Sequence, residues 1–205
     1  MDDVRNIEAV IFDLGRVIVD VDIHRPAGFV FSQMSQADVE RLITAVMGDE
    51  LMVRFNTGRV APQEFYEELT ERFGLAIGFE EFKDLWCGVF SPIAPMEEMI
   101  RQLNGACRLG LLSDTDPLHW AYLHSTYPVL SLFARPTLSF EVGTVKPDPA
   151  IFLAAAKNVD TPVERCLYID DLAANVRGAV AVGMTGIVFG GAAELRAELV
   201  EKGLL

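Results

Sequence analysis

The chain has 205 residues, of which 51% are hydrophobic and 23% are charged, and 30 acidic against 17 basic residues give a net charge of −13. This composition is typical of a globular protein with enough apolar residues for one core and an inserted subdomain. It argues against nucleic-acid binding, which relies on clustered basic side chains, and against an anionic membrane surface, and no apolar run approaches the roughly 20 residues that span a bilayer.

The first predicted element is a strand over residues 9–12, an apolar run that ends in Asp13. Continuous apolar runs of this length are typical of strands buried on both faces of a parallel sheet. Residues 23–91 break this pattern, because they show helical periodicity and no strand-like run. The helices expected there span residues 35–47, 62–73 and 79–90. We therefore predict an all-helical subdomain inserted after the first strand.

Strand-like and helix-like runs alternate after the insert. Strands are predicted over residues 109–112, 166–169 and 185–189, with a weaker one over 137–140. Helices are predicted over residues 148–158, 172–182 and 192–202. Crossovers of this length predict an α/β fold, a doubly wound parallel sheet core with an inserted all-helical cap subdomain. We assign residues 1–20 and 92–205 to the core and residues 21–91 to the cap.

Polar side chains follow the predicted strands at the point where each strand ends. Asp13 follows the first strand, Ser113 and Asp114 follow the second, and Asp170 and Asp171 follow a later one. Ligands of open α/β sheets bind outside the carboxyl ends of the strands. Carboxylates gathered there repel one another unless a cation lies among them, and Mg²⁺ is the hard, oxygen-ligated cation that fits.

Lys146 adds a positive charge before the Pro-Asp-Pro start of the helix expected at residues 148–158. A lysine and a hydroxyl beside an aspartate and a Mg²⁺ are the groups that phosphoryl transfer needs, and an aspartate can act as the covalent nucleophile. Each residue alone is most often a turn or helix-capping residue. The set, in this order along the chain, is far more specific.

Four segments resemble the four motifs of the haloacid dehalogenase-like hydrolase superfamily: residues 11–20, 111–116, 142–149 and 168–171. The resemblance covers residues 9–190, and the helical insert is similar to the helical cap of that superfamily. The branch with Phe-Asp-Leu-Gly in its first motif resembles small bacterial sugar-phosphate phosphatases, including one that acts on glucose 1-phosphate. The resemblance implies a Mg²⁺-dependent phosphatase that acts on a small phosphate ester such as a sugar phosphate.

The resemblance also implies roles for individual residues. Asp13 would attack phosphorus and, with the backbone carbonyl of Gly15, ligate Mg²⁺. Asp171 would ligate Mg²⁺ directly, and Asp170 would either ligate it or support a ligand. Ser113 would hydrogen-bond a phosphoryl oxygen, while Lys146 would neutralise charge on the nucleophile and the phosphoryl group; both would be catalytic together with Asp13. The substrate-binding residues would be Leu14, Gly15, Arg16, Ser113, Asp114 and Lys146, with turn N–H groups holding the phosphate.

Two positions depart from the family pattern. The usual acid-base aspartate, two residues after the nucleophile, is Gly15 here, and losing a positioned proton donor typically costs about 10²–10⁴-fold in rate. Asp20, Asp22 and His24 stay open as replacements. Asp114 stands where this branch usually has Asn. Because a carboxylate beside a phosphate opposes binding, we expect Asp114 to be a turn or cap residue that faces away.

Two further side chains have alternative interpretations. The Arg16 guanidinium suits a phosphate or cap contact, and equally a surface ion pair with Asp20 or Asp22. His119 and Trp120 lie on the helix expected after the second strand. Packing is the expectation for Trp120, and His119 is a candidate for the edge of the site.

Two other functions stay open. A metal-independent 2-haloacid dehalogenase, in which an aspartate displaces halide from carbon, is disfavoured because Asp170 and Asp171 would then repel the nucleophile. A catalytically impaired binding or regulatory member of the fold is favoured by Gly15 and Asp114. The remaining motif residues oppose it.

The compartment and assembly are read from few signals. Residues 1–5 lack the basic and apolar regions of a secretion signal. Cys87, Cys107 and Cys166 form no CxxC pair and are expected to be buried free thiols in a reducing compartment. We therefore expect a cytoplasmic protein. The sequence carries no signal for an oligomeric state.

Overall fold

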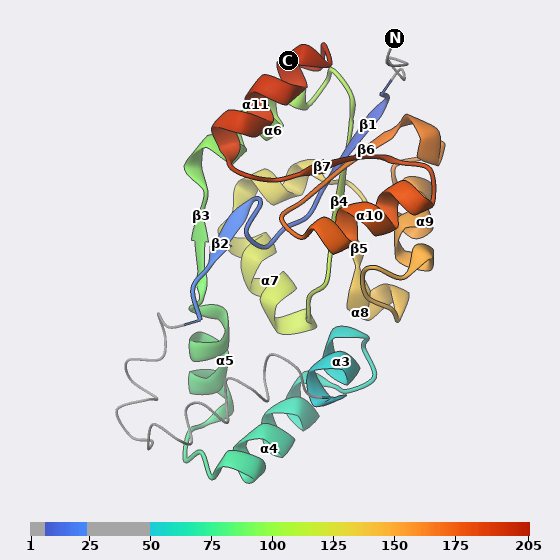
Figure 1. The fold of residues 1–205 in the computed structure, drawn as a ribbon. Coiled ribbons are helices and arrows are strands. Elements are labelled where there is room, and N and C mark those ends of the chain that lie inside the picture. Colours follow the sequence, from blue (N-terminus) through green and yellow to red (C-terminus); the bar gives the residue numbers. More distant parts are fainter. Residues whose placement is uncertain (1–6, 24–49) are drawn as a thin grey trace.

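The computed structural model describes residues 7–23 and 50–205. Within these residues, five parallel strands form a sheet of order β5-β4-β1-β6-β7 (Figure 1). The strands are β1 (Ala9–Phe12), β4 (Arg108–Ser113), β5 (Thr137–Leu138), β6 (Cys166–Asp170) and β7 (Thr185–Val188). The strands predicted at residues 9–12, 109–112, 166–169 and 185–189 are therefore confirmed to within one residue at each end.

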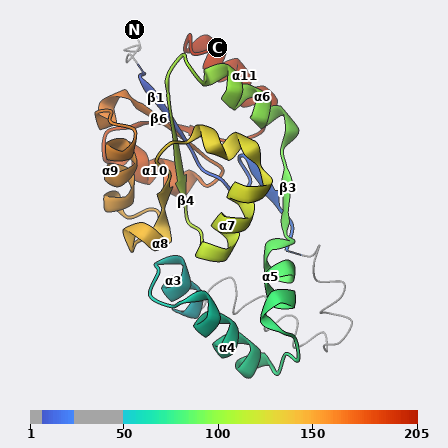
Figure 2. The same cartoon turned by 180° about the vertical axis from the view of Figure 1, so that it is seen from behind.

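Helices cover both faces of this sheet, which confirms the doubly wound fold. One layer holds α6 (Ala94–Leu103), α7 (Pro117–Thr126) and α11 (Ala192–Glu201). The other layer holds α9 (Pro149–Asn158) and α10 (Ala173–Ala181). Figure 2 shows the sheet between the two layers. Two short 3₁₀ helices, η1 (Pro128–Leu132) and η2 (Val163–Arg165), lie in loops of this core.

The environment of the central strand β1 explains why its sequence predicted a buried strand. Its side chains alternate, so that Val10 and Phe12 join the core on the α6 side, while Ala9 and Ile11 join the core on the α9 side. All four are fully buried. A strand covered on both faces needs apolar residues at every position, which is why its sequence is a continuous apolar run.

The cap helices in the described residues are α3 (Glu50–Asn56), α4 (Pro62–Phe73) and α5 (Phe79–Cys87), below the core in Figure 1. They share a hydrophobic cluster of their own, formed by Leu51, Phe55, Val60, Phe65, Leu69 and Phe82. At its centre the rings of Phe55 and Phe65 stack at 4.0 Å between centroids. The helix predicted at residues 62–73 is confirmed, and the one predicted at residues 35–47 lies outside the described residues.

The helix predicted at residues 79–90 is wrong at its end. It stops at Cys87, is followed by Gly88, and Phe90–Pro92 forms strand β3. β3 pairs antiparallel with β2 (Val19–Val21), with Val21 opposite Phe90. The insert is therefore bordered by a short two-stranded sheet where the chain leaves and re-enters the core. The pairing partner is about 70 residues away in sequence, so local periodicity did not indicate it.

The strand predicted at residues 137–140 is also too long. Only Thr137–Leu138 is extended, and Ser139–Val142 forms the helical turn α8, closed by Gly143 in the left-handed region at φ +84°. The Ser139 hydroxyl accepts from the N–H of Thr115 and donates to its carbonyl. These bonds draw the chain away from the sheet edge. Helices α3 and α6 were not predicted at all.

No helix in the described part of the chain is long and apolar enough to cross a membrane. All three cysteines are free thiols, as expected; Cys87 and Cys166 are buried, whereas Cys107 is only partly buried.

Candidate active site

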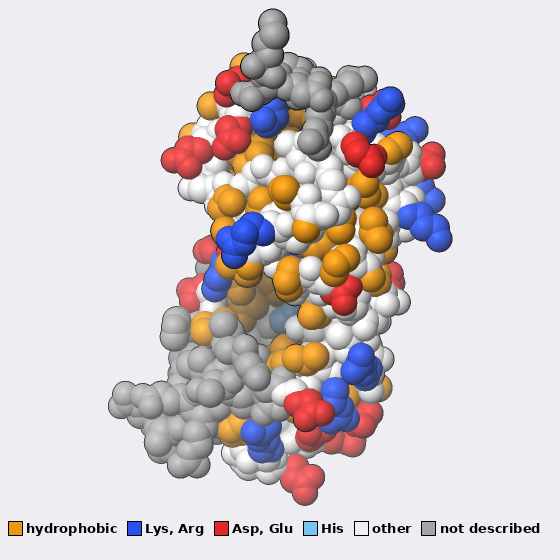
Figure 3. All heavy atoms as spheres, turned by 45° about the vertical axis from the view of Figure 1, so that its right-hand side comes forward, with side chains coloured by type: hydrophobic (Ala, Val, Ile, Leu, Met, Phe, Trp, Pro, Cys, Tyr) orange, Lys and Arg blue, Asp and Glu red, His pale blue; other side chains and the backbone are white. Residues whose placement is uncertain are grey.

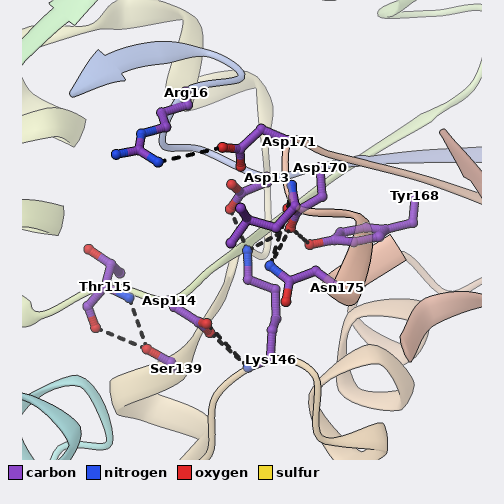
Figure 4. Close-up of polar contacts among 11 residues, drawn as sticks. Asp13, Arg16, Asp114, Thr115, Ser139, Lys146, Tyr168, Asp170, Asp171 and Asn175 are labelled. Atoms are coloured by element: carbon purple, nitrogen blue, oxygen red, sulfur yellow. Dashed lines mark hydrogen bonds and ion pairs between the residues drawn. The ribbon is translucent and has the colours of Figure 1, made fainter. Parts of the chain in front are cut away.

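The predicted site residues come together at one edge of the sheet (Figure 4). Asp13 follows β1, Ser113 ends β4, Asp170 ends β6, and Lys146 reaches in from the loop before α9. The strands β4, β1 and β6 are neighbours and run parallel, so their carboxyl ends meet here. The order of the strands therefore converts positions far apart in sequence into one cluster.

Lys146 lies between two carboxylates. Its Nζ donates to Asp13 Oδ1 at 2.6 Å and to Asp170 Oδ2 at 2.9 Å. All three side chains are buried. Burial alone would lower the pKa of Lys146, but the charges of Asp13 and Asp170 outweigh it and hold the pKa above its usual value. The lysine therefore carries a fixed positive charge against the expected nucleophile.

Asp13 and Asp170 differ in pKa although they share this lysine. Burial raises the pKa of Asp13 from 3.8 to about 6; the charge of Lys146 opposes this shift and that of Asp170 adds to it. Burial would also raise the pKa of Asp170, but Lys146 and the hydroxyl of Tyr168 hold it below its usual value. The charged form of Asp13 is therefore less well stabilised than that of Asp170, and a further cation beside Asp13 would favour it.

Asp170 is oriented by a dense set of donors. Besides Lys146, it accepts from the hydroxyl of Tyr168, from the N–H of Leu172 at 2.8 Å, and from the side-chain amide of Asn175 at 3.1 Å. It is fully buried. These contacts engage both of its oxygens and hold the carboxylate against Lys146.

Sequence reasoning missed Tyr168 and Asn175. Tyr168 lies two residues before Asp170 on β6, and period two places both side chains on the same face of the strand. Asn175 lies in the first turn of α10, directly after the strand end. Strand alternation could therefore have predicted Tyr168, and the expected helix start could have predicted Asn175.

Three carboxylates form a candidate metal site. Asp13, Asp170 and Asp171 each offer one oxygen, and these oxygens lie within 4.8 Å of one another. Burial raises the pKa of Asp171, Asp170 adds to the shift, and Arg16 opposes it. An all-oxygen set of carboxylates is what Mg²⁺ prefers, and it costs repulsion without a cation. The donor set therefore fits Mg²⁺.

The turn after Asp13 is tightly shaped. Arg16 has a left-handed backbone at φ +59°, and its N–H donates to the carbonyl of Val19 at 2.6 Å. Its side chain is 56% exposed, with Nη1 3.9 Å from Asp171 Oδ2. Asp171 is a partner that the sequence reasoning did not name. Leu14 and Gly15 follow the nucleophile in sequence as part of this turn, and Leu14 is buried.

The loop after β4 holds the lysine loop in place. The Asp114 carboxylate accepts from the backbone N–H of Lys146 at 3.1 and 3.2 Å, one distance to each oxygen. Burial raises the pKa of Asp114, and the charge of Lys146 opposes the shift. Ser113, the neighbouring residue, is buried at the end of β4. The Asp114 carboxylate is therefore engaged as an acceptor for the chain that carries Lys146.

The other described candidates make their contacts with residues outside this cluster. Asp20 is exposed on β2, where its carboxylate accepts from the N–H of Val21. His24 lies outside the described residues. Trp120 packs against the core, as predicted. His119 contacts the cap helix α5, through Trp86, and is described below.

Comparison with known proteins places the chain among related sequences. A model of the haloacid dehalogenase-like hydrolases matches residues 7–183. The chain is 26% identical over 200 residues to the D-ribitol-5-phosphate phosphatase of Bacteroides thetaiotaomicron, covering 94% of this chain and 97% of that protein. It is 26% identical over 186 residues to the sesquiterpene phosphatase astK of Aspergillus oryzae, covering 88% of each.

Solved structures show the same fold. A HAD-like family hydrolase from Porphyromonas gingivalis is 26% identical, with a TM-score of 0.78 over 95% of this chain and 98% of that one. A HAD family enzyme from Bacteroides thetaiotaomicron, in complex with magnesium and inorganic phosphate, is 22% identical, with a TM-score of 0.78 over 88% and 93% of the two chains. The L-2-haloacid dehalogenase of Xanthobacter autotrophicus is 15% identical, with a TM-score of 0.63 over 97% and 84%.

Proposed function

The chain belongs to the haloacid dehalogenase-like hydrolases, and we propose that it is a Mg²⁺-dependent phosphatase that hydrolyses a small phosphorylated metabolite through an aspartyl-phosphate at Asp13. The observation that carries this proposal is the buried Lys146 against Asp13, beside three carboxylates whose oxygens lie within 4.8 Å of one another. The relative that acts on D-ribitol 5-phosphate supports a sugar or polyol phosphate as the substrate class.

The residues of the cluster divide the chemistry. Asp13 Oδ attacks phosphorus, so that a P–O bond to the carboxylate forms as the ester P–O bond breaks, and water later hydrolyses the aspartyl-phosphate. Lys146 neutralises charge on Asp13 and on the phosphoryl oxygens, and the Ser113 hydroxyl donates to one of those oxygens. Turn N–H groups at Leu14, Gly15 and Asp114 hold the others.

Asp13, Asp171 and the backbone carbonyl of Gly15 would hold Mg²⁺, with Asp170 supporting the site through Lys146. The ion supplies a positive charge that neutralises the phosphoryl group during transfer. Because Gly15 offers no proton to the leaving oxygen, the chain suits an ester whose leaving group needs little protonation, such as an anomeric sugar hydroxyl.

The cap is proposed to select the leaving group. In this proposal the core comprises residues 1–20 and 92–205, and the cap comprises residues 21–91.

On the face drawn in Figure 3, the described Lys and Arg side chains are scattered among acidic ones and form no continuous basic patch. A small ester therefore suits the molecule better than a polyanion such as nucleic acid.

The test is a phosphate-release screen over sugar phosphates, polyol phosphates, nucleotides and p-nitrophenyl phosphate, with Mg²⁺ and with a chelator. We expect Mg²⁺-dependent release that Asp13→Asn abolishes and Asp171→Asn makes dependent on much higher Mg²⁺. Glu98→Gln, on the exposed face of α6, removes one negative charge far from the site and serves as the control.

Three outcomes oppose the proposal. Unchanged turnover in Asp13→Asn would remove the nucleophile from the mechanism. Halide release from 2-haloacids that a chelator does not affect would favour the dehalogenase instead. Binding of a phosphate mimic at Asp13, with no turnover across the screen, would favour a catalytically impaired member of the fold.

A further inference from the structure

The contact between the cap helix α5 and the core helix α7 contains a buried polar group of residues. The two helices lie side by side in Figures 1 and 2. The His119 ring of α7 stacks on Trp86 of α5, with centroids 5.0 Å apart and planes 4° from parallel. Phe90 of β3 meets the same ring edge-on at 4.8 Å. The partly buried histidine ring therefore lies between the core and the cap.

Asp116 is the centre of the hydrogen bonds at this contact. It is fully buried and caps α7, because its Oδ1 accepts from the N–H groups of Leu118 and His119, each at 2.9 Å. Its Oδ2 accepts from Trp86 Nε1 at 3.1 Å and lies 2.7 Å from His119 Nδ1. One carboxylate thus joins the start of α7 to the indole of the cap.

The geometry defines the protonation of His119. Its Nδ1 faces the Asp116 carboxylate, and its Nε2 lies 2.9 Å from the backbone carbonyl of Trp86. Both partners are acceptors, whereas a neutral imidazole has a single N–H. Only the imidazolium satisfies both contacts. Burial opposes this charged form, but the charge of Asp116 outweighs it and raises the pKa of His119.

The charge also matches the ends of the two helices. The Trp86 carbonyl lies in the last turn of α5, where the helix carries partial negative charge and has no basic residue of its own. His119 supplies that positive charge from a different element. Asp116 lies at the start of α7, where a carboxylate is favourable.

Other titratable groups around this contact are few in the described residues. Cys87 follows Trp86 and contacts the carbonyl of Leu118, and burial, with a contribution from Asp116, raises its pKa to about 12. It therefore stays neutral. Lys83 and Asp84 of α5 carry opposite charges that offset each other. Tyr122 lies about one turn after His119 on α7. His119 is thus the group at this contact whose ordinary pKa lies closest to neutrality.

We propose that His119 is a positioning residue, an imidazolium that fastens the cap to the loop that binds phosphate, and that loss of its proton releases the cap. The coupling is short, because Asp116 lies two residues after Asp114 and three after Ser113 on the same loop. When the ring is neutral, either the Trp86 carbonyl loses the His119 donor, or Asp116 Oδ2 loses it and keeps only the donor from the Trp86 indole. The kinetic consequence rests on the proposed function; the protonation and cap release do not.

The protonation is tested on the unaltered protein by long-range ¹H–¹⁵N NMR of the histidine rings. We expect both nitrogens of His119 to be protonated at pH 7, with a titration midpoint above the ordinary 6.5. A neutral His119 ring at pH 7 would overturn the proposal. This measurement requires neither a variant nor a substrate.

Cap release is tested with His119→Phe, which keeps an aromatic ring beside Trp86 and removes both donors, and with His124→Phe as the matched control on the same helix. We expect backbone amides of α5 to exchange hydrogen at least roughly threefold faster in His119→Phe, with α9 unchanged, and His124→Phe to match the unaltered protein. The unaltered protein should show the same change above the His119 midpoint. Equal exchange at α5 in all three proteins would reject cap release.

The kinetic test uses p-nitrophenyl phosphate between pH 6 and 9. Because a released cap lowers the fraction of closed protein, KM should rise with pH in the unaltered protein and be high at every pH in His119→Phe, while kcat changes far less. A pH dependence of KM that survives in His119→Phe would overturn the coupling. If no hydrolysis occurs in any protein, the proposed function fails, and the exchange and NMR results still decide the role of His119.

Discussion

At the scale of single residues, the site depends on one buried lysine that is shared by two carboxylates. Lys146 contacts Asp13 at 2.6 Å and Asp170 at 2.9 Å. A buried charge is tolerable only when it is paired and hydrogen-bonded, and each partner here has its own supports. The supports, Tyr168 and Asp114, are therefore the residues at which substitution tests the arrangement without removing its catalytic members.

Tyr168→Phe should destabilise the protein by about 1.5–3 kcal/mol, the usual contribution of a hydrogen bond to a charged group. The lost hydroxyl donates to Asp170 Oδ2, and phenylalanine leaves the buried ring packing intact. Urea unfolding measures the change, with Tyr122→Phe on the partly exposed face of α7 as the control. Equal stability of the two variants would mean that the hydroxyl contributes nothing to holding Asp170.

Asp114→Asn and Asp114→Ala should differ. Asparagine keeps an oxygen that can accept from the N–H of Lys146 and removes a negative charge near the phosphate, so inhibition by inorganic phosphate should be as strong or stronger. Alanine leaves that N–H without its acceptor, which costs about 1–3 kcal/mol, and should weaken phosphate inhibition. Phosphate inhibition constants measure both effects. Weaker inhibition in Asp114→Asn than in Asp114→Ala would contradict this role.

At the scale of elements, the described cap helices have two main contacts with the core. One is the contact of α5 with α7, and the other is the contact of α3 with α8. At the second, the turn after α3 approaches α8 so closely that a Cβ on Gly58 would lie 2.2 Å from the carbonyl oxygen of Phe140. The cap can take this position only because that residue has no side chain.

Gly58→Ala should therefore disturb the cap more than a matched change elsewhere. Gly74→Ala is the control, because Gly74 has a similar left-handed backbone, φ +62° against +69°, and nothing within 4 Å of an added Cβ. Both should lose about 1–2 kcal/mol to backbone strain. Gly58→Ala should lose more and should speed hydrogen exchange at residues 139–142. Equal losses in the two variants would show that the close approach does not hold the cap.

At the scale of the whole molecule, the charges that give the net −13 are unevenly distributed. Asp13, Asp170 and Asp171 are concentrated at one edge of the sheet, beside Lys146 and Arg16. With a dication the local potential there can be positive, although the protein is acidic overall. Screening over about 8 Å at physiological salt separates this edge from the remaining surface charge.

The stability of the whole protein should depend on pH through Asp116 and His119. Burial opposes the charge of both, yet their mutual attraction lowers the pKa of Asp116 and raises that of His119 in the folded state. The contribution of His119 is complete below its unfolded pKa of 6.5 and is lost as pH rises through its higher folded pKa. The contribution of Asp116 is complete above its unfolded pKa of 3.8 and is lost as pH falls through its lower folded pKa.

The difference in unfolding free energy between the unaltered protein and His119→Phe should therefore be largest between about pH 4 and 6.5 and shrink at higher pH. Urea unfolding at a series of pH values measures this difference, and the subtraction removes the titration of the other carboxylates. His124→Phe, in the last turn of α7, is the matched control. A His119→Phe difference that grows above pH 8 would have the wrong sign.

The sequence by itself determined the sheet and the chemical type of the site. β1 reads as a strand because burial on both faces requires apolar residues throughout, and the polar residues after the strands meet wherever parallel neighbours end together. Asp13, Ser113, Asp170 and Asp171 were predicted in this way, and Lys146 was predicted from its place before the helix expected at residues 148–158. These features depend on local periodicity and on a rule of sheet topology, so they are visible along the chain.

Only the tertiary structure decided what surrounds those residues. The pairing of Phe90 with Val21, the end of β5 before Ser139, and the contact of His119 with Trp86 each depend on a partner 24 to about 70 residues away. Hydrogen bonds and buried charges are satisfied by whichever group the fold brings near, and sequence spacing does not encode that partner. The residues that indicate the chemistry of the site can thus be recognised from local sequence. The contacts that attach the cap to the core form only after folding.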